Sequence, residues 1–226
     1  MAYHQQKKLL FIHIPKNAGK SIELALSLVS ETLIARPRTR GRFNLVAKYI
    51  LNQTQNKLMR QRLFGSYDYV LCAQHLTMQE IELLNLISLA EIKAASTFAV
   101  IRNPYSRALS TFRHFKKSTD LSDFKSFWRE FLVYDGLDHN QIAHRRTQKS
   151  YVVDCRGKLA IDNLLRFESL NDDFEQFCRD HSLEHAGLPK LGAHDRLDYH
   201  DFYDSEARKL VESIFAEDID EFKYVY

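Results

Sequence analysis

The chain has 226 residues, of which 45% are hydrophobic, and its formal net charge is +3. This length and composition are typical of a soluble globular protein with room for one medium-sized α/β domain. No stretch approaches the roughly 20 apolar residues of a membrane-spanning helix. Because the net charge is small, local clusters of charge decide what the protein binds.

The N-terminal apolar run is interrupted at His13 and Pro15, which makes it too short for a secretory signal. The chain has three cysteines, Cys72, Cys155 and Cys178, which are far apart and lack the spacing of metal ligands. We therefore expect a cytoplasmic protein with free thiols. The histidines are scattered and do not predict a zinc site.

Apolar runs at residues 8–14, 67–72 and 97–101 predict three strands, and helical patterns follow at residues 19–29, 44–63, 77–87, 104–115 and 121–133. An arginine-rich stretch at residues 36–42 reads as a loop. Thr77 and Glu80 form a predicted capping box, and Asn103 with Pro104 suits the start of a helix. This alternation favours a parallel sheet covered by helices on both faces.

In the second half, residues 151–154 and 161–167 are predicted as strands and residues 169–181 and 205–215 as helices. Residues 138–149 fit neither pattern, and residues 185–201 read as a loop. No repeat or linker is present. The prediction is one α/β domain, residues 1–226, with a central parallel sheet flanked by helices.

The first predicted strand leads into His-Ile-Pro-Lys-Asn-Ala-Gly-Lys-Ser at residues 13–21. Its end resembles the phosphate-binding motif G-x-x-x-x-G-K-[ST], but Ile14 stands where the first glycine belongs. Backbone amides at the start of a helix can still bind a phosphate group. The predicted ligand-binding residues are Lys16, Asn17, Ala18, Gly19, Lys20 and Ser21. The alternative is that both lysines only face solvent.

A P-loop NTPase also needs Mg²⁺, usually held by an acidic residue at the end of a strand. The predicted strand ends read Gln74-His75 and Arg102-Asn103, and neither supplies a carboxylate. We therefore expect an anionic nucleotide to bind without a metal.

A second cationic turn follows the strand at residues 97–101. Arg102 can bind a phosphate in forked fashion, and the hydroxyl of Ser110, two helical turns on, can add a donor. Arg107 could face the ligand or an acidic neighbour, and the alternative for the pair is a surface arginine with an interior serine. Two such turns suggest a nucleotide phosphorylated at its 5′ and 3′ ends.

Together these motifs resemble those of the PAPS-dependent sulfotransferases, where PAPS is 3′-phosphoadenosine-5′-phosphosulfate, and are most similar to the carbohydrate branch, which includes heparan and chondroitin O-sulfotransferases. The resemblance implies a P-loop-kinase-like sulfotransferase fold and adenosine 3′,5′-bisphosphate as product. It also implies that Lys16 contacts the bridging oxygen of the donor and that Arg102 and Ser110 hold the 3′-phosphate. Residues 165–174 and 218–224 resemble other family segments. Two residues depart from the family pattern: Lys20 stands where many members have Thr or Ser, and Asn103 stands where many have Asp.

Transfer to a hydroxyl requires a base, and histidine has a suitable pKa. His75 follows a predicted strand and resembles the catalytic histidine of the glycan 2-O-sulfotransferases, although it could instead cap the next helix. His13 alternates with apolar residues and is expected in the interior. His144, Arg145 and Gln148 resemble a segment that contacts the acceptor; the alternative is an exposed polar loop. By weaker resemblance, residues 190–196 close over the nucleotide.

The resemblance implies a carbohydrate acceptor, and residues 36–42 could meet a uronate-bearing glycan. Nucleic acid is a less favoured partner, because the sequence shows neither a recognition helix nor aromatic residues interleaved with the basic ones. Two rival functions remain: a Mg·ATP-dependent kinase or NTPase, and a non-catalytic nucleotide-binding module.

Overall fold

The structure is a computed structural model that describes residues 2–4, 6–28, 75–83, 87–116, 118–133, 139–185, 187–189 and 198–226. The loop predicted at residues 36–42, the helix at 44–63, the strand at 67–72 and the segment at 190–196 lie outside these ranges. No helix within them is long and apolar enough to cross a membrane.

Four strands form one sheet in the described part of the chain, in the order β1 (Ala2–His4), β2 (Leu9–Ile12), β3 (Ser96–Ile101) and β4 (Asn163–Arg166). Strands β2, β3 and β4 are parallel, with Phe11 opposite Phe98 and Phe98 opposite Asn163. Strand β1 pairs antiparallel with β2. The sheet is therefore mostly parallel, as predicted. Its antiparallel edge strand, β1, was not predicted because its three residues are too few to show a strand pattern.

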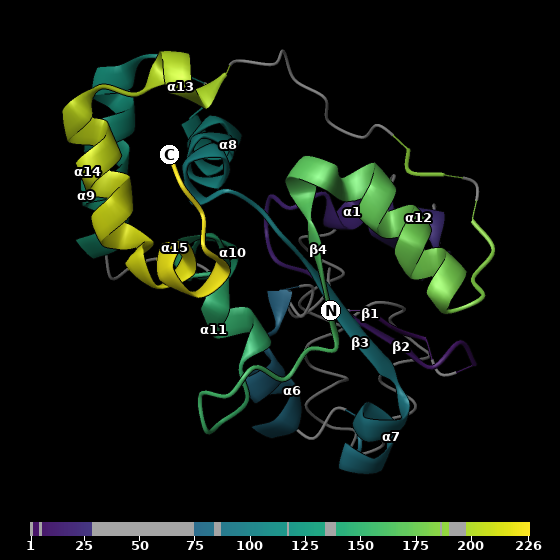
Figure 1. The fold of residues 1–226 in the computed structure, drawn as a ribbon. Coiled ribbons are helices and arrows are strands. Elements are labelled where there is room, and N and C mark those ends of the chain that lie inside the picture. Colours follow the sequence, from purple (N-terminus) through teal and green to yellow (C-terminus); the bar gives the residue numbers. More distant parts are fainter. Residues whose placement is uncertain are drawn as a thin grey trace, which may run out of the picture.

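Helices cover both faces of this sheet (Figure 1). On one face, α1 (Gly19–Ala25) and α12 (Leu170–Asp180) pack against β2 and β3 through a core that includes Ile22, Phe98 and Phe177. The other face is covered by α6 (Met78–Leu83), α7 (Leu89–Ala94), α11 (Lys149–Val152) and α15 (Ala216–Phe222). Apolar strands buried on both faces are typical of a parallel sheet.

A third core lies beside the sheet, where α8 (Pro104–Lys116), α9 (Leu121–Val133) and α14 (Ser205–Ile214) pack together (Figure 1). Its largest buried side chains are aromatic: Phe112, Phe124, Trp128 and Phe215. The short helices α10 (His139–Arg145) and α13 (Tyr199–Phe202) complete the described elements around it. This packing fixes α8, which begins at the second predicted phosphate turn.

Most predicted elements in the described ranges are confirmed, including two helix starts. Thr77 Oγ1 accepts from the Glu80 amide at 3.1 Å while the Glu80 carboxylate accepts from the Thr77 amide at 2.9 Å, which is the predicted capping box. Asn103 Oδ1 accepts from the Tyr105 amide at 3.0 Å and so caps α8.

The strand predicted at residues 151–154 is wrong, because its first half lies in α11, which ends at Val152. The buried carboxylate of Asp218 accepts from the amides of Gln148 and Lys149, both at 2.8 Å, and so supports a helical first turn. Only Val153 forms a β-bridge, with Leu159. The loop at residues 185–201 also needs correction, since α13 begins at Tyr199 after the cap Asp198.

Candidate functional site

The two predicted phosphate loops meet at one edge of the sheet. Strands β2 and β3 are parallel neighbours, with Ile12 opposite Ala99, so both loops leave from the carboxyl ends of adjacent strands. The first loop enters α1 and the second enters α8. Ligands of open α/β sheets bind at this edge, where the loops after the strands can converge on one molecule.

The first loop has an unusual backbone. Lys16 and Ala18 both have positive φ, at 70° and 59°, although neither is glycine. Such left-handed residues between right-handed ones turn successive amides toward one point and form an anion-binding concavity. Buried Asn17 holds the loop in place by donating from Nδ2 to the carbonyl of Val100 at 2.7 Å. Positive φ angles at residues other than glycine cost backbone free energy. The hydrogen bond from Asn17 to β3 helps to hold the loop in this conformation.

Position 19 has no room for a side chain, because the imidazole ring of His13 lies against it. A Cβ built on Gly19 would overlap the imidazole of His13. His13 is 4% exposed, and its Nδ1 lies 2.7 Å from Oε1 of Glu23 on α1. The structure thus places His13 in the interior, as expected, where it forms the floor of the loop.

Two lysines of the loop supply positive charge. Lys16 is partly buried, and its burial, together with Arg102 and Lys20 nearby, lowers its pKa to about 8. Lys20 is exposed and Ser21 is buried beneath it in the first turn of α1. A partly desolvated ammonium among other cations is poised to bind an anion, because binding removes the repulsion.

Arg102 joins the two loops directly. Its Nη1 donates to the carbonyl of Lys16 at 2.9 Å, and its Nε and Nη2 donate to Oγ of Ser106 at 3.0 and 2.7 Å. Its guanidinium carbon lies 4.0 Å from the ring centre of Phe167. Burial lowers its pKa to about 10, which still leaves it cationic at neutral pH. These bonds do not exhaust its N–H donors, so the rest can bind a phosphate.

Ser106 was missed by the sequence reasoning, although its spacing of four from Arg102 was visible. Ser110 lies one turn further along α8, is partly exposed, and forms no hydrogen bond with the described residues. Ser106 and Ser110 therefore share a face of the helix at i and i+4. The first orients Arg102, and the second has a hydroxyl available for a ligand.

The segment at residues 165–174 supports this turn from the side. The carboxylate of Glu168 accepts from the Asn103 amide at 2.7 Å and from the hydroxyl of Tyr224 at 3.1 Å. The two regions of weaker family resemblance thus meet beside Arg102.

Arg107 was predicted to face either the ligand or an acidic neighbour. It is 1% exposed and donates to the carbonyls of Pro15 and Arg146 at 3.2 and 3.0 Å. Burial lowers its pKa, and the nearby carboxylate of Asp218 opposes that shift. Arg107 therefore supports the first loop from beneath rather than facing solvent.

Gln148 was predicted to contact the acceptor, and the structure gives it a different position. It is fully buried, and its Oε1 accepts from Asn17 Nδ2 at 2.7 Å and from the Arg102 amide at 2.8 Å. Its Nε2 donates to the Arg102 carbonyl at 2.8 Å. With every polar atom of the side chain engaged, Gln148 fastens the two phosphate loops to each other.

Arg145 also points elsewhere, since its Nη1 donates to the carbonyls of Phe131 and Leu132 at the end of α9, at 3.4 and 2.9 Å. A cation there is favourable for the helix. Of the three predicted acceptor contacts, His144 alone lies among other candidate catalytic side chains.

His75 lies just before α6 and is partly buried. Its Nδ1 is 2.9 Å from the carbonyl of His13. A carbonyl can only accept, so Nδ1 carries the proton and Nε2 has the free lone pair when the ring is neutral. Burial, chiefly, lowers the pKa of His75 well below its ordinary value, which keeps the ring neutral at pH 7.

Four histidine rings from different parts of the fold are neighbours in turn: His13, His75, His144 and His114. The ring centres of His13 and His75 are 4.8 Å apart. The ring centres of His75 and His144 are 5.7 Å apart, and those of His144 and His114 are 5.1 Å apart. His144 is 4% exposed, and its Nδ1 lies 2.8 Å from the Asn140 carbonyl. His114, on α8, was missed by the sequence reasoning because only the fold brings it here.

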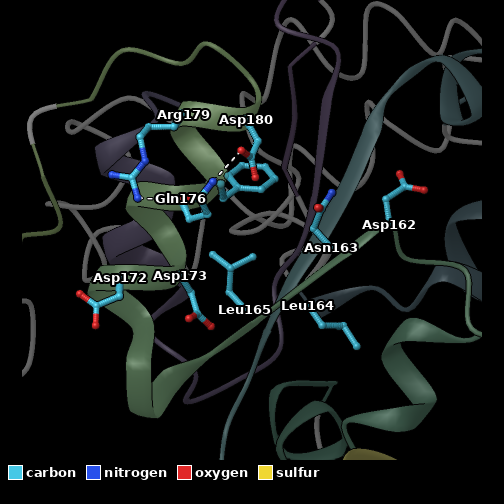
Figure 2. A pocket seen from close by; sticks show the side chains of 10 residues that line it. Asp162, Asn163, Leu164, Leu165, Asp172, Asp173, Gln176, Arg179 and Asp180 are labelled. Atoms are coloured by element: carbon cyan, nitrogen blue, oxygen red, sulfur yellow. Dashed lines mark hydrogen bonds between the residues drawn. The ribbon is translucent and has the colours of Figure 1, made fainter.

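A separate hollow of about 560 Å³ lies between β4 and α12 (Figure 2). Four of the residues that line it carry carboxylates: Asp162, Asp172, Asp173 and Asp180. None of the predicted site residues lies there, and its charge does not suit a phosphorylated ligand.

No group of three or more His, Cys, Asp or Glu side chains in the described ranges is arranged to hold a metal ion. The groups that converge on the loops are instead lysine, arginine, hydroxyl and imidazole.

Comparison with known proteins identifies the chain. It matches the family model described as the sulfotransferase family over residues 1–225. No curated protein and no solved structure gave a match. The family consists of enzymes and includes carbohydrate sulfotransferases, and membership implies transfer of a sulfuryl group from PAPS. Its motifs, its fold and this match together show that the chain belongs to the sulfotransferase family.

Proposed function

We propose that this enzyme transfers the sulfuryl group of PAPS to a hydroxyl of a carbohydrate. The observation that carries the proposal is the contact between Arg102 and the Lys16 carbonyl, which joins two phosphate-type loops at one edge of the sheet. A nucleotide with phosphate at both the 5′ and 3′ positions presents anionic groups to both loops. The donor and the reaction type follow from family membership; the acceptor and the residue roles are our proposal.

Lys16 and the amides of its loop bind the 5′ end of the donor in this proposal. As the bond between sulfur and the 5′-phosphate breaks, negative charge grows on the leaving phosphate. A cation already positioned there stabilises that charge without rearranging, and one such donor is typically worth about 3 kcal/mol.

Arg102 and Ser110 hold the 3′-phosphate. Ser106 keeps the guanidinium oriented before the ligand arrives, while the Ser110 hydroxyl is left without a partner among the described residues. Preorganised donors reduce the entropy cost of binding.

His75 takes the proton of the acceptor hydroxyl at Nε2. The Nδ1–H of the ring is held by the His13 carbonyl, which fixes the tautomer that leaves Nε2 free. The acceptor oxygen then bonds to sulfur on the side opposite the leaving phosphate, and the bond between sulfur and that phosphate breaks, so the phosphate is displaced in line.

The carbohydrate acceptor rests on the resemblance of residues 13–21 and 102–110 to the carbohydrate branch, a branch that this family includes. We propose further that no metal takes part, because lysine and arginine supply the positive charge at both loops. A cytoplasmic location remains a prediction.

Nucleotide binding tests this proposal directly. Adenosine 3′,5′-bisphosphate should raise the melting temperature in the presence of EDTA, whereas adenosine 5′-monophosphate should do so less. Arg102→Ala should remove the difference between the two nucleotides, and Arg156→Ala, an exposed arginine, should not. A requirement for Mg·ATP would instead support a kinase or NTPase.

Turnover separates an enzyme from a binding module. Labelled PAPS is incubated with a panel of glycans, phenols, lipids and peptides, and we expect label on glycans. Lys16→Ala should abolish transfer, and His75→Asn should reduce it while nucleotide still binds. Full activity of His75→Asn would remove His75 from the mechanism.

A further inference from the structure

The second loop consists of only two residues, Arg102 and Asn103, which join the end of β3 to the start of α8. Every backbone polar group of this turn is bonded. Gln148 bonds both the amide and the carbonyl of Arg102. The amide of Asn103 donates to Glu168 Oε1 at 2.7 Å, and its carbonyl accepts from the Arg107 amide at 2.9 Å. Gln148 and Arg107 also bond the first loop, whereas the described bonds of Glu168 on the two loops are confined to the second.

Glu168 is exposed, yet both of its carboxylate oxygens are engaged. It lies in a single 3₁₀ turn, Phe167–Ser169, between β4 and α12. Its Oε2 accepts from the hydroxyl of Tyr224, a residue that is buried. The guanidinium carbon of Arg166 lies 4.8 Å from the centre of the Tyr224 ring, and its Nη2 donates to the Phe222 carbonyl at 2.9 Å. The carboxylate is therefore oriented before any ligand binds, which reduces the entropy cost of holding the turn.

The residue before Glu168 acts on the same turn. Phe167 lies against the guanidinium of Arg102, while Glu168 bonds the backbone amide of the next residue, Asn103. The oxygens of Glu168 bond Asn103 and Tyr224 rather than the guanidinium, so Arg102 keeps N–H donors for a phosphate. One short 3₁₀ turn thus holds both the side chain and the backbone of the second loop.

The charge of Glu168 opposes the binding of an anion at this loop, because a carboxylate repels a phosphate held by Arg102. The bond from the Asn103 amide requires only an acceptor, and the side-chain oxygen of a neutral glutamine also supplies one. A repelling charge and a fixed acceptor therefore predict opposite results when the side chain is truncated: tighter binding in the first case and weaker binding in the second.

We propose that Glu168 is a positioning residue for the 3′-phosphate: by fixing the turn that carries Arg102, it gives the enzyme its preference for a nucleotide phosphorylated at the 3′ position. Tyr224 acts through Glu168 by orienting its carboxylate. This inference rests on the proposed function, which assigns the 3′-phosphate to Arg102.

The test compares two nucleotides that differ only in the 3′-phosphate. Calorimetric titration of the full chain in EDTA gives the Kd of adenosine 3′,5′-bisphosphate and that of adenosine 5′-monophosphate, and the ratio of the two measures the preference. Glu168→Ala should lower the preference about tenfold, while the Kd of the monophosphate changes by less than about twofold. General damage to the fold or to the first loop would instead weaken the binding of both nucleotides.

Glu168→Gln is the conservative variant, because it keeps an acceptor for the Asn103 amide and removes the charge. It should retain the preference of the wild type or exceed it. Tyr224→Phe is a milder perturbation that removes one hydroxyl and leaves the ring. It should lower the preference about threefold, and it should change nothing further in a Glu168→Ala background.

The matched control is Tyr105→Phe. This variant also removes a hydrogen bond from a tyrosine hydroxyl to a glutamate, in this case Glu212 at 2.9 Å, and it lies on α8 itself. Glu212 bonds Arg208 within α14 rather than the second loop. Tyr105→Phe should therefore keep the preference, and a loss equal to that of Tyr224→Phe would overturn the inference in favour of a general loosening of α8.

The remaining outcomes separate the inference from the proposed function. A preference that falls in Glu168→Ala and persists in Glu168→Gln supports the inference. If the wild type prefers the bisphosphate and Glu168→Ala keeps or strengthens that preference, the inference is overturned and the proposed function stands. An equal loss in Glu168→Gln also overturns it, since glutamine retains the acceptor. A wild-type protein with no preference for the bisphosphate would contradict the proposed function and the inference together.

Discussion

At the scale of single residues, Lys16 should make nucleotide binding depend on pH. Its pKa is lowered to about 8, so the ammonium loses its charge as the pH rises through that value. The affinity for adenosine 3′,5′-bisphosphate should therefore fall above pH 8, by up to tenfold per unit, or about 20-fold between pH 7.5 and 9.5. Calorimetric titration across this range measures the effect.

The matched variant is Lys16→Arg, which keeps a charge throughout this pH range. Its affinity should be nearly constant with pH, while Lys16→Ala should bind weakly at every pH. If Lys16→Arg loses affinity as steeply as the wild type, another group is responsible for the pH dependence.

Gly19 offers a steric test of the same loop. Gly19→Ala forces a Cβ into the ring of His13, and overpacking of this kind costs about 1–3 kcal/mol of the free energy of unfolding. Denaturant unfolding measures the loss.

The control for Gly19→Ala is the same change in a His13→Ala background, where the ring is absent. The two substitutions should be strongly non-additive, because they remove one shared clash. Additive losses would show that the ring is not the reason for the glycine.

How much of the site the sequence could predict differs from residue to residue. Lys16 and Arg102 belong to local motifs whose chemistry is readable without a fold, and the structure brings their loops into contact. The role of Gln148 depends on tertiary placement. Gln148 bonds with residues 46 and 131 positions away, and no local pattern contains such a partner.

At the scale of elements, Gln148 couples three segments: the first loop, the end of β3 and the start of α11. Gln148→Leu keeps the volume but leaves buried donors on Asn17 and Arg102 without an acceptor. We expect a loss of about 3 kcal/mol in the free energy of unfolding, together with weaker nucleotide binding. Denaturant unfolding and calorimetry measure the two effects.

Gln176→Leu on α12 is the matched control, because that side chain is exposed and bonds only within its own helix. It should change stability by less than about 0.5 kcal/mol. A Gln148→Leu protein with unchanged stability and a raised KM for the acceptor would instead favour the acceptor contact predicted from the sequence.

The elements that the sequence mispredicted also depend on distant contacts. The apolar pair Tyr151 and Val152 suits a strand by composition. Asp218, about 70 positions later in the chain, accepts from the amides of residues 148 and 149 and so favours a helix instead. Strand β1 escaped prediction for another reason: it has three residues and exists by pairing with β2. The long periodic pattern of α9, in contrast, predicts a helix without reference to any distant contact.

At the scale of the whole molecule, the buried histidines should make the fold sensitive to acid. Burial lowers the pKa of His75 and His144 well below the ordinary value of 6.5. The unfolded chain therefore binds more protons than the folded chain below pH 6.5, and the stability present above that pH is lost as the pH falls. Each histidine should cost up to about 2 kcal/mol between pH 7 and 5, the limit reached when the folded form takes up no proton in that window.

Denaturant unfolding at a series of pH values measures this slope. The window from pH 7 to 5 is chosen because most carboxylates titrate below it. The double variant His75→Asn and His144→Asn should lose the share of the slope that these two imidazoles contribute, since asparagine does not titrate, and should keep the share of His114, whose pKa is lowered to about 4. An undiminished slope in the double variant would mean that other groups set the acid sensitivity. A loss confined to the double variant would show that His75 and His144 are neutral because the fold desolvates them. The same desolvation would then limit the pH range in which the enzyme stays folded.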